Sequence, residues 1–324
     1  MRHSREVALA IAIVAVAVIM ALGAPGFFRL ENQRDLLMAN MPVVIVALGM
    51  TLVILTGQID ISVGSQFALL SVAAGVLAKA GLPTPAAALA VCVGGGLAGA
   101  LNGALVAYVR IPSIVVTLAT MVALRDGLRW ATQGAWVQNL PPGFQWFGQS
   151  QAASEALTLG AVVVLVAGFA WGLRYRAAGR AFYAAGSNPE AARLSGIEPA
   201  RVVFWAFAVT GALTGLAAVF NTARFNQIPS NAGLGLELQV IAAVIVGGVA
   251  VTGGQGTLAG AFLGVTLLGM IGPALTFLGI SAYWERAIQG AIILAAVALD
   301  RGKVAGRKAS HAAPGLAEKH AQRA

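Results

Sequence analysis

Residues 57–64 carry polar side chains in a spacing that suits hydrogen bonding to a small polar molecule. Gln58, Asp60 and Ser62 alternate with apolar residues, and this period of two predicts extended rather than helical backbone. Apolar runs flank the segment, and non-helical backbone at membrane depth occurs only inside protein or beside water. An acid there is a candidate functional residue. The alternative is that Asp60 or Ser62 caps the following helix, where a carboxylate is favourable.

Other polar residues lie in or beside apolar runs, and several have a structural explanation. Asn102, within GGGLAGALNGAL, suits an interhelical hydrogen bond. Arg125 beside Asp126, and Glu285 beside Arg286, predict local pairing or snorkelling near helix ends. The remaining polar residues of this kind are Thr117, Asn221 and Glu237.

An enzyme is difficult to build from the rest of the sequence. His3, His311 and His320 lie near the two ends of the sequence, and Cys92 is the single cysteine. These residues predict no catalytic triad, no cysteine metal site and no internal disulfide. Residues 247–260 are rich in glycine but lack the Gly-Lys-Ser/Thr ending of a phosphate-binding loop. We therefore expect no catalytic residues, no metal and no cofactor in this chain.

The elements that position these residues are organised around a polar interruption at 174–201, which carries five arginines. Within it Asn188 suits an N-cap and Pro189 the first helical position. Glu190 lies where the helix dipole favours an anion, and Gly196 suits a C-cap. These signals predict about two turns of helix just outside the membrane. Because so short a helix is unstable alone, we expect another protein surface to pack on it.

Composition predicts an all-α polytopic membrane protein, since 58% of residues are hydrophobic, only 10% are charged, and the mean hydropathy is +0.82. Lysine and arginine concentrate in the segments on the side of both termini, which places both termini in the cytoplasm. This bias also accounts for the net charge of +9, and no nucleic-acid recognition motif accompanies it. About ten transmembrane helices are expected, at 7–24, 38–56, 63–80, 84–109, 112–128, 157–173, 202–222, 237–252, 256–277 and 284–299.

The runs at 112–128 and 237–252 are the least regular, so one helix pair is expected to be broken or re-entrant. Residues 1–300 form one transmembrane domain, and the basic, alanine-rich segment 301–324 is expected to be a disordered cytoplasmic tail. The run at 7–24 also resembles a cleavable signal peptide, although Pro25 argues against cleavage there.

Two further patterns leave alternatives open. The loop 129–156, which carries three tryptophans, is either an interfacial aromatic belt or a docking surface for an external partner. Segments 55–70 and 251–265 both interrupt apolar runs with Thr-Gly and glutamine. This weak echo is consistent with an internal repeat, in which paired interrupted segments mark a substrate path.

Four motifs in order make the chain resemble the permease subunits of bacterial ATP-binding-cassette (ABC) importers, in the ribose-type sugar branch. GQIDISVG at 57–64 is similar to that family's first signature, with Gln58 where glycine is usual. IPSIVVTLATM at 111–121 resembles its second signature, and GRAFYAAGSNPEAARLSGI at 179–197 its cytoplasmic loop. IAAVIVGGVAVTGGQGTLAGAFLG at 241–264 also matches.

The resemblance implies a subunit of the bacterial inner (plasma) membrane that works within an assembly. Its partners would be a second permease copy or paralogue, an external substrate-binding protein, and ABC ATPase subunits that bind ATP and Mg²⁺. The loop 174–201 would then hold the coupling helix, which lies in a groove of the ATPase. The coupling residues implied are Gly186, Asn188, Pro189, Glu190, Ala191, Arg193 and Gly196.

The substrate-path residues implied by the same resemblance are Gln58, Asp60, Ser62, Asn102 and Thr117. Their hydrogen-bonding groups suit a sugar, because buried hydroxyls need paired donors and acceptors. Pentose, hexose, deoxyhexose and furanosyl signal molecules all stay open as substrates. Two other classes remain as alternatives: a secondary transporter coupled to ions through an acid such as Asp60, and a membrane scaffold that moves nothing.

Overall fold

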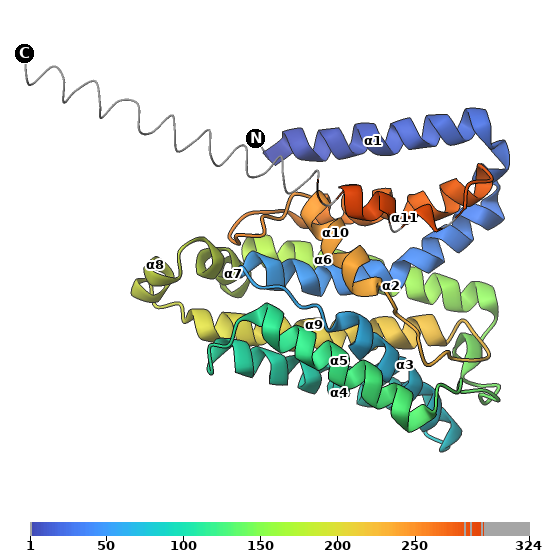
Figure 1. Ribbon diagram of the computed structural model, residues 1–324, viewed down its shortest axis with the longest axis horizontal. Coiled ribbons are helices and arrows are strands. Elements are labelled where there is room, and N and C mark those ends of the chain that lie inside the picture. The colour runs from blue at the N-terminus through green and yellow to red at the C-terminus, as the bar shows by residue number, and fades with distance from the viewer. Residues whose placement is uncertain (1, 282, 286, 293, 295–324) are drawn as a thin grey trace, which may run out of the picture.

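The computed structural model describes residues 2–281, 283–285, 287–292 and 294 (Figure 1). The expected tail at 301–324 and part of the run at 284–299 lie outside the described residues. The described part of the chain is helical, and its β-structure is one isolated bridge between Val137 and Ile228. The α-helices are α1 (Arg2–Gly23), α2 (Leu30–Leu55), α3 (Val63–Lys79), α4 (Thr84–Ala107), α5 (Ser113–Thr132), α6 (Gln151–Tyr175), α7 (Ala177–Ser187), α8 (Pro189–Leu194), α9 (Pro199–Thr222), α10 (Leu236–Val246) and α11 (Leu258–Phe277), with 3₁₀ turns at Pro25–Phe28 and Gln145–Gly148.

Six of these helices are long and apolar enough to cross a membrane: α1, α2, α4, α6, α9 and α11. This confirms the all-α membrane class that the composition predicts. α3 and α10 are apolar but shorter, with 17 and 11 residues. The early end of α10 fits the expected irregular segment at 237–252, whereas 112–128 lies within the unbroken α5. The total of about ten spans and the cytoplasmic position of both termini stay predictions.

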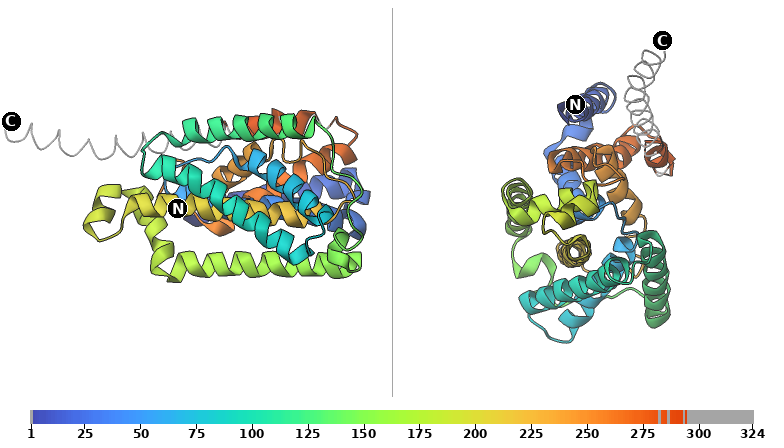
Figure 2. Two further views of the ribbon diagram at one scale, coloured as in Figure 1. Left: turned by 90° about the horizontal axis from the view of Figure 1, so that it is seen from below. Right: turned by 90° about the vertical axis from the view of Figure 1, so that its left-hand side faces the viewer.

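The long helices run roughly along one axis, and α2 and α9 lie between two edges (Figures 1 and 2). α1 forms one edge beside α11, and α4 and α5 form the other. Every residue of α2 from Met41 to Leu55 is buried, so this helix is the centre of the core. α7 and α8 project beyond the bundle at one end in both views. We call this the α8 end, and α9 runs from it to the opposite end at Thr222.

α4 and α9 touch through their backbones. A Cβ added at Gly95 would lie 2.2 Å from the carbonyl oxygen of Gly211, and one added at Gly99 would lie 2.2 Å from that of Phe207. A Cβ added at Gly211 would in turn lie 2.0 Å from the Gly95 oxygen. Only glycine permits this approach, which in lipid replaces the missing hydrophobic driving force with close packing. The glycines of α4 and α9 therefore fix the distance between the core and the α4–α5 edge.

Candidate functional site

α8 has the caps that its sequence predicts. The Asn188 Oδ1 accepts hydrogen bonds from the backbone N–H groups of Glu190 (3.1 Å) and Ala191 (3.0 Å). At the other end Gly196 has a φ of +78°, and the Ile197 N–H donates to the Ala192 carbonyl at 2.9 Å. This is a Schellman C-cap, in which a left-handed glycine ends the helix. Six residues are therefore held helical by caps at both ends.

The surface of α8 is exposed and carries an unpartnered apolar side chain. Of the residues expected to contact an ATPase, those from Asn188 to Gly196 are exposed, whereas Gly186 is half-buried. Leu194 is 87% exposed on this polar helix. The sequence analysis missed Leu194, although a leucine among the polar residues of a short capped helix was the available signal. α8 therefore presents a polar surface with one exposed apolar side chain at the projecting end of the bundle.

A backbone junction joins α7 and α8 to the interior. The Gly254 N–H donates to the Leu55 carbonyl at 2.8 Å, at the C-terminal end of α2. A Cβ added at Gly186 would lie 1.8 Å from that carbonyl oxygen and 2.7 Å from the Gly254 nitrogen. The Ser187 Oγ donates to the Gly254 carbonyl at 3.3 Å. We call Leu55, Gly186, Ser187 and Gly254 the tripod junction, because three chain segments meet there.

Gly254 and its neighbour Gly253 have φ values of +72° and +84°, so the turn itself requires glycine. The two echoing segments, 55–70 and 251–265, therefore touch each other at their Thr-Gly positions. Gly186 lies inside this contact rather than on the exposed surface of α8.

The next polar feature along the chain is a buried hydrogen-bond network centred on Ser62. The Ser62 Oγ donates to the Asp60 Oδ1 at 2.5 Å and accepts from the Gln66 Nε2 at 2.7 Å and the Asn102 Nδ2 at 2.9 Å. The Thr120 hydroxyl donates to the Asn102 Oδ1 at 2.7 Å. Asp60, Ser62, Gln66 and Asn102 are fully buried. The name Ser62 network is used for five residues that connect α3, α4 and α5: Asp60, Ser62, Gln66, Asn102 and Thr120.

Two of the other predicted path residues lie beside this network. The Thr117 hydroxyl donates to the Ser113 carbonyl at 2.8 Å and lies 3.5 Å from the Ile59 carbonyl. The Ile59 N–H donates to the Ser113 hydroxyl at 3.3 Å. Gln58 is half-buried in the irregular backbone before α3. The structure thus brings all five predicted path residues into one region, tied by hydrogen bonds to α4 and α5.

The capping alternative holds for Asp60 in part. Its Oδ1 accepts from the Ser62 N–H at 2.9 Å, which fixes the turn that leads into α3. Ser62 is the N-cap residue of α3 but makes no side-chain cap bond. Its hydroxyl is committed to the network instead. The second Asp60 oxygen and the Gln66 Oε1 have no hydrogen-bond partner.

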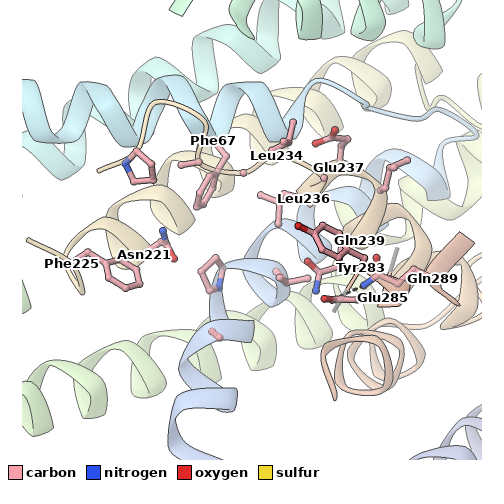
Figure 3. A pocket seen from close by; sticks show the side chains of 18 of the residues that line it. Phe67, Asn221, Phe225, Leu234, Leu236, Glu237, Gln239, Tyr283, Glu285 and Gln289 are labelled. Atoms are coloured by element: carbon pink, nitrogen blue, oxygen red, sulfur yellow. Dashed lines mark hydrogen bonds between the residues drawn. The ribbon is translucent and has the colours of Figure 1, made fainter. Parts of the chain in front are cut away.

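A cavity of about 1050 Å³ lies elsewhere, at the end of the bundle opposite α8. It is bounded by α2, α3, the segment 221–239, and Ser281, Tyr283, Glu285, Gln289 and Gly290. Figure 3 shows Gln239, Tyr283, Glu285 and Gln289 gathered together, with Asn221 and Phe225 approaching from another side. No predicted path residue lines it. The sequence analysis recorded Asn221, Glu237 and Glu285 as polar residues near the membrane but gave them structural roles only.

Glu237 connects this cavity to the helices around it. Its carboxylate lies 3.4 Å from the Arg125 guanidinium and is largely buried. A Cβ added at Gly64 would lie 1.9 Å from the same carboxylate, so Glu237 abuts the first turn of α3. The helix dipole favours an anion there. The expected local pairing of Arg125 with Asp126 is therefore replaced by a pairing across 112 residues, because consecutive helical residues point in different directions.

The expected pairing of Glu285 with Arg286 lies outside the described residues. The Glu285 Oε1 instead accepts from the Gln289 Nε2 at 3.0 Å. Among the residues that the structure describes, no group of three histidine, cysteine, aspartate or glutamate side chains lies close enough to hold a metal ion.

The comparisons with known proteins decide the family. Residues 33–297 match the family described as "Branched-chain amino acid transport system / permease component". The chain belongs to this permease family. It is 35% identical to an autoinducer 2 import system permease protein, LsrC, of Enterobacter sp. (strain 638) over 92% of this chain and 87% of that protein.

Two further relatives in this permease family have the same name. The LsrC proteins of Escherichia coli (strain K12 / DH10B) and Salmonella choleraesuis are 34% and 35% identical over 92% of this chain, covering 87% and 86% of their own lengths. No solved structure matches the chain. The resemblance to ABC importer permeases is confirmed, and with it a place in the bacterial inner membrane. Permease subunits of this kind are not themselves enzymes.

Proposed function

We propose that this chain is the membrane-spanning subunit of an ABC importer for a sugar or sugar-like small molecule. A substrate-binding protein delivers the molecule outside, and separate ATPase subunits bind ATP and Mg²⁺ and drive its passage. The capped and exposed α8, seated on the tripod junction, carries this proposal. The chain spans the membrane about ten times, with the α8 end and both termini in the cytoplasm.

The distribution of arginine supports this orientation. The five arginines of 174–201 lie in or beside α7 and α8. Arg176 also stacks on the Trp171 ring, with 4.4 Å between the guanidinium carbon and the ring centroid. Tryptophan is enriched at membrane interfaces, and arginine on the cytoplasmic side. The Thr257 hydroxyl donates to Glu6, which places the start of α1 at this same end.

The coupling mechanism follows from the contacts of α8. Asn188, Pro189, Glu190, Ala191, Arg193 and Gly196 shape a short helix that lies in a groove of the ATPase, with Leu194 buried on docking. When the ATPase pair closes on ATP, α8 moves with it. Gly186 passes that movement to the ends of α2 and α10–α11 through the tripod junction. The Ser62 network then moves as one hydrogen-bonded unit with α3, α4 and α5.

The substrate assignment is supported by the relatives, whose names describe import of autoinducer 2. Among the pentoses, hexoses, deoxyhexoses and furanosyl signal molecules, these names favour an autoinducer-2-like furanosyl molecule as the substrate. Gln58, Asp60, Ser62, Asn102 and Thr117 line the inner part of the path when it opens. A second permease, either a copy of this chain or a paralogue, completes the membrane channel.

The test is affinity purification of the chain from its native membrane in a mild detergent. An ATPase that carries a phosphate-binding-loop signature and hydrolyses ATP is expected to co-purify. Leu194→Asp should remove it, because a charge would replace the exposed apolar contact. Val109→Asp, at another exposed apolar residue beyond the end of α4, is the matched control and should keep the ATPase.

The alternative of an ion-coupled secondary transporter predicts a different outcome. Uptake would stop when the proton and sodium gradients are collapsed with ATP held constant, and no ATPase would co-purify. That pair of results would overturn the importer assignment.

A further inference from the structure

The polar side chains that line the cavity at the end opposite α8 are neutral or acidic among the described residues. They include side-chain amides and two carboxylates, among them Asn221, Gln239, Glu237 and Glu285. No lysine, arginine or histidine is found among its described lining residues. The amides, with the hydroxyls of Ser281 and Tyr283, both donate and accept hydrogen bonds, and the two carboxylates add acceptors. An anionic ligand such as a phosphate ester would meet carboxylates without a neighbouring cation in the lining, which is unfavourable.

The two carboxylates already have partners. Glu237 pairs with Arg125, which lies behind it on α5, and Glu285 accepts from Gln289. The Arg125 guanidinium offsets one negative charge without itself lining the cavity. A carboxylate with a second partner keeps free lone pairs that can accept from a hydroxyl group. The polar part of the lining can therefore bind the hydroxyl groups of an uncharged ligand.

Four aromatic side chains also line the cavity. Phe67, Trp136, Phe225 and Tyr283 come from four separate segments of the chain. Flat apolar rings beside a few convergent polar groups are typical of small-molecule sites. Such rings can cover the C–H faces of a sugar while amides and carboxylates bind its hydroxyls. A volume of about 1050 Å³ is at the upper end of the range for such sites.

We propose that this cavity binds an uncharged, polyhydroxylated molecule of sugar size, with Glu237 and Gln239 binding its hydroxyls, and that it rejects phosphorylated analogues. The inference rests on the proposed import function and adds an outer binding site that the sequence did not indicate. Four of the five residues of the Ser62 network are fully buried, whereas the cavity is open. The cavity is thus the first site that the molecule meets, and the predicted path residues act after it.

Protection of an introduced cysteine tests the proposal. Cys92, the native cysteine, is replaced by serine, and Leu234→Cys places a thiol in the cavity wall. Membrane vesicles that contain the full chain are treated with a membrane-impermeant thiol reagent from the outer side. The probes are D-ribose, D-xylose, D-glucose, D-fructose and L-rhamnose, compared with ribose 5-phosphate and the cationic D-glucosamine. Leu82→Cys, an exposed leucine on the α3–α4 loop at the same end, is the matched control.

At a concentration about five times the dissociation constant, a neutral sugar that binds should slow labelling at Leu234→Cys about sixfold. Ribose 5-phosphate should not slow it, and the Leu82→Cys reaction should not change with any probe. In the same reporter, Glu237→Gln should raise the sugar concentration needed for protection about tenfold, through loss of a charged hydrogen bond. Equal protection by ribose 5-phosphate, stronger protection by D-glucosamine, or no protection by any neutral sugar would overturn the proposal.

Labelling needs neither the ATPase nor the binding protein. A negative result here therefore leaves the importer assignment to its own co-purification test, and failure of that test leaves the labelling result standing.

Discussion

Gly186→Ala tests the route by which α8 acts on the membrane helices. The added Cβ would lie 1.8 Å from the Leu55 carbonyl oxygen, whereas real Cβ atoms keep at least 3.0 Å. The oxygen, or the whole of α7, must therefore retreat by at least about 1.2 Å. The same methyl group would lie 2.7 Å from the Gly254 nitrogen, so it intrudes on the hydrogen bond that closes the tripod junction.

The energetic cost can be estimated from these contacts. Loss of the Gly254–Leu55 hydrogen bond costs about 0.5–1.5 kcal/mol. Overpacking against backbone adds about 1–3 kcal/mol, since a carbonyl cannot rotate away as a flexible side chain could. The higher helix propensity of alanine returns about 1 kcal/mol. The junction should therefore weaken by about 0.5–3.5 kcal/mol while the helices around it stay folded.

The assay is ATP-driven uptake in proteoliposomes that hold the complete transporter, combined with hydrogen exchange on the permease. Gly186→Ala should reduce uptake about tenfold, which corresponds to a loss of about 1.4 kcal/mol in coupling, within that range. Amide exchange should rise at Gly254 and nearby but not in α4 or α9. Gly168→Ala, in α6 with open space around the added methyl, is the control and should transport normally. Normal uptake and unchanged exchange in Gly186→Ala would refute the tripod junction as the transmission point.

Three further predictions follow from local geometry. Gly196→Val should abolish uptake at unchanged membrane abundance, since a β-branched residue resists the φ of +78°, whereas Gly196→Asn should retain uptake. Ser62→Ala should lower the free energy of unfolding by about 2–4 kcal/mol, because three buried partners each lose a hydrogen bond. Ser71→Ala should be nearly neutral, because the Ser71 hydroxyl has no hydrogen-bond partner. Thermal melts in detergent measure both variants. Arg125→Met should destabilise the protein by about 1–3 kcal/mol, because it leaves the Glu237 carboxylate buried without its cationic partner. The double variant Arg125→Met with Glu237→Leu should recover most of this loss in the same melts. A double variant as unstable as the single one would contradict the pairing.

Sequence reasoning predicted best the features that depend on neighbouring residues. The caps of α8 at Asn188 and Gly196 follow from side-chain chemistry within one short segment, and both have the expected geometry. The period of two at 57–64 predicted extended backbone, which is correct for the irregular residues 58–60 but wrong from residue 61 on, where the chain turns and α3 begins at Val63. At α8 and at residues 58–60 the local signal and the tertiary structure agree.

The cavity could not be predicted, because its walls come from segments as far apart in the sequence as Ala39 and Gly290. Glu237 and Glu285 are adjacent in sequence to ordinary helix-end residues, and nothing local shows that they share a cavity with Phe67. Local pairing was likewise the natural expectation for Arg125, and only the packing of α5 beside α3 and α10 brings it to Glu237. Gly186 was assigned to the ATPase contact, since its sequence gives no sign that Leu55 lies against it.

The glycine contact between α4 and α9 has a consequence for how the protein is made. α4 leaves the ribosome more than one hundred residues before the end of α9. At a synthesis rate of about 5–20 residues per second, α4 waits on the order of ten seconds for its partner. During that time the glycine-rich face of α4 lacks the helix on which it packs most closely, and glycine lowers the intrinsic stability of the helix. We therefore expect α4 to be most exposed to membrane proteases before α9 is inserted, and a pause in translation between them to lengthen that exposure.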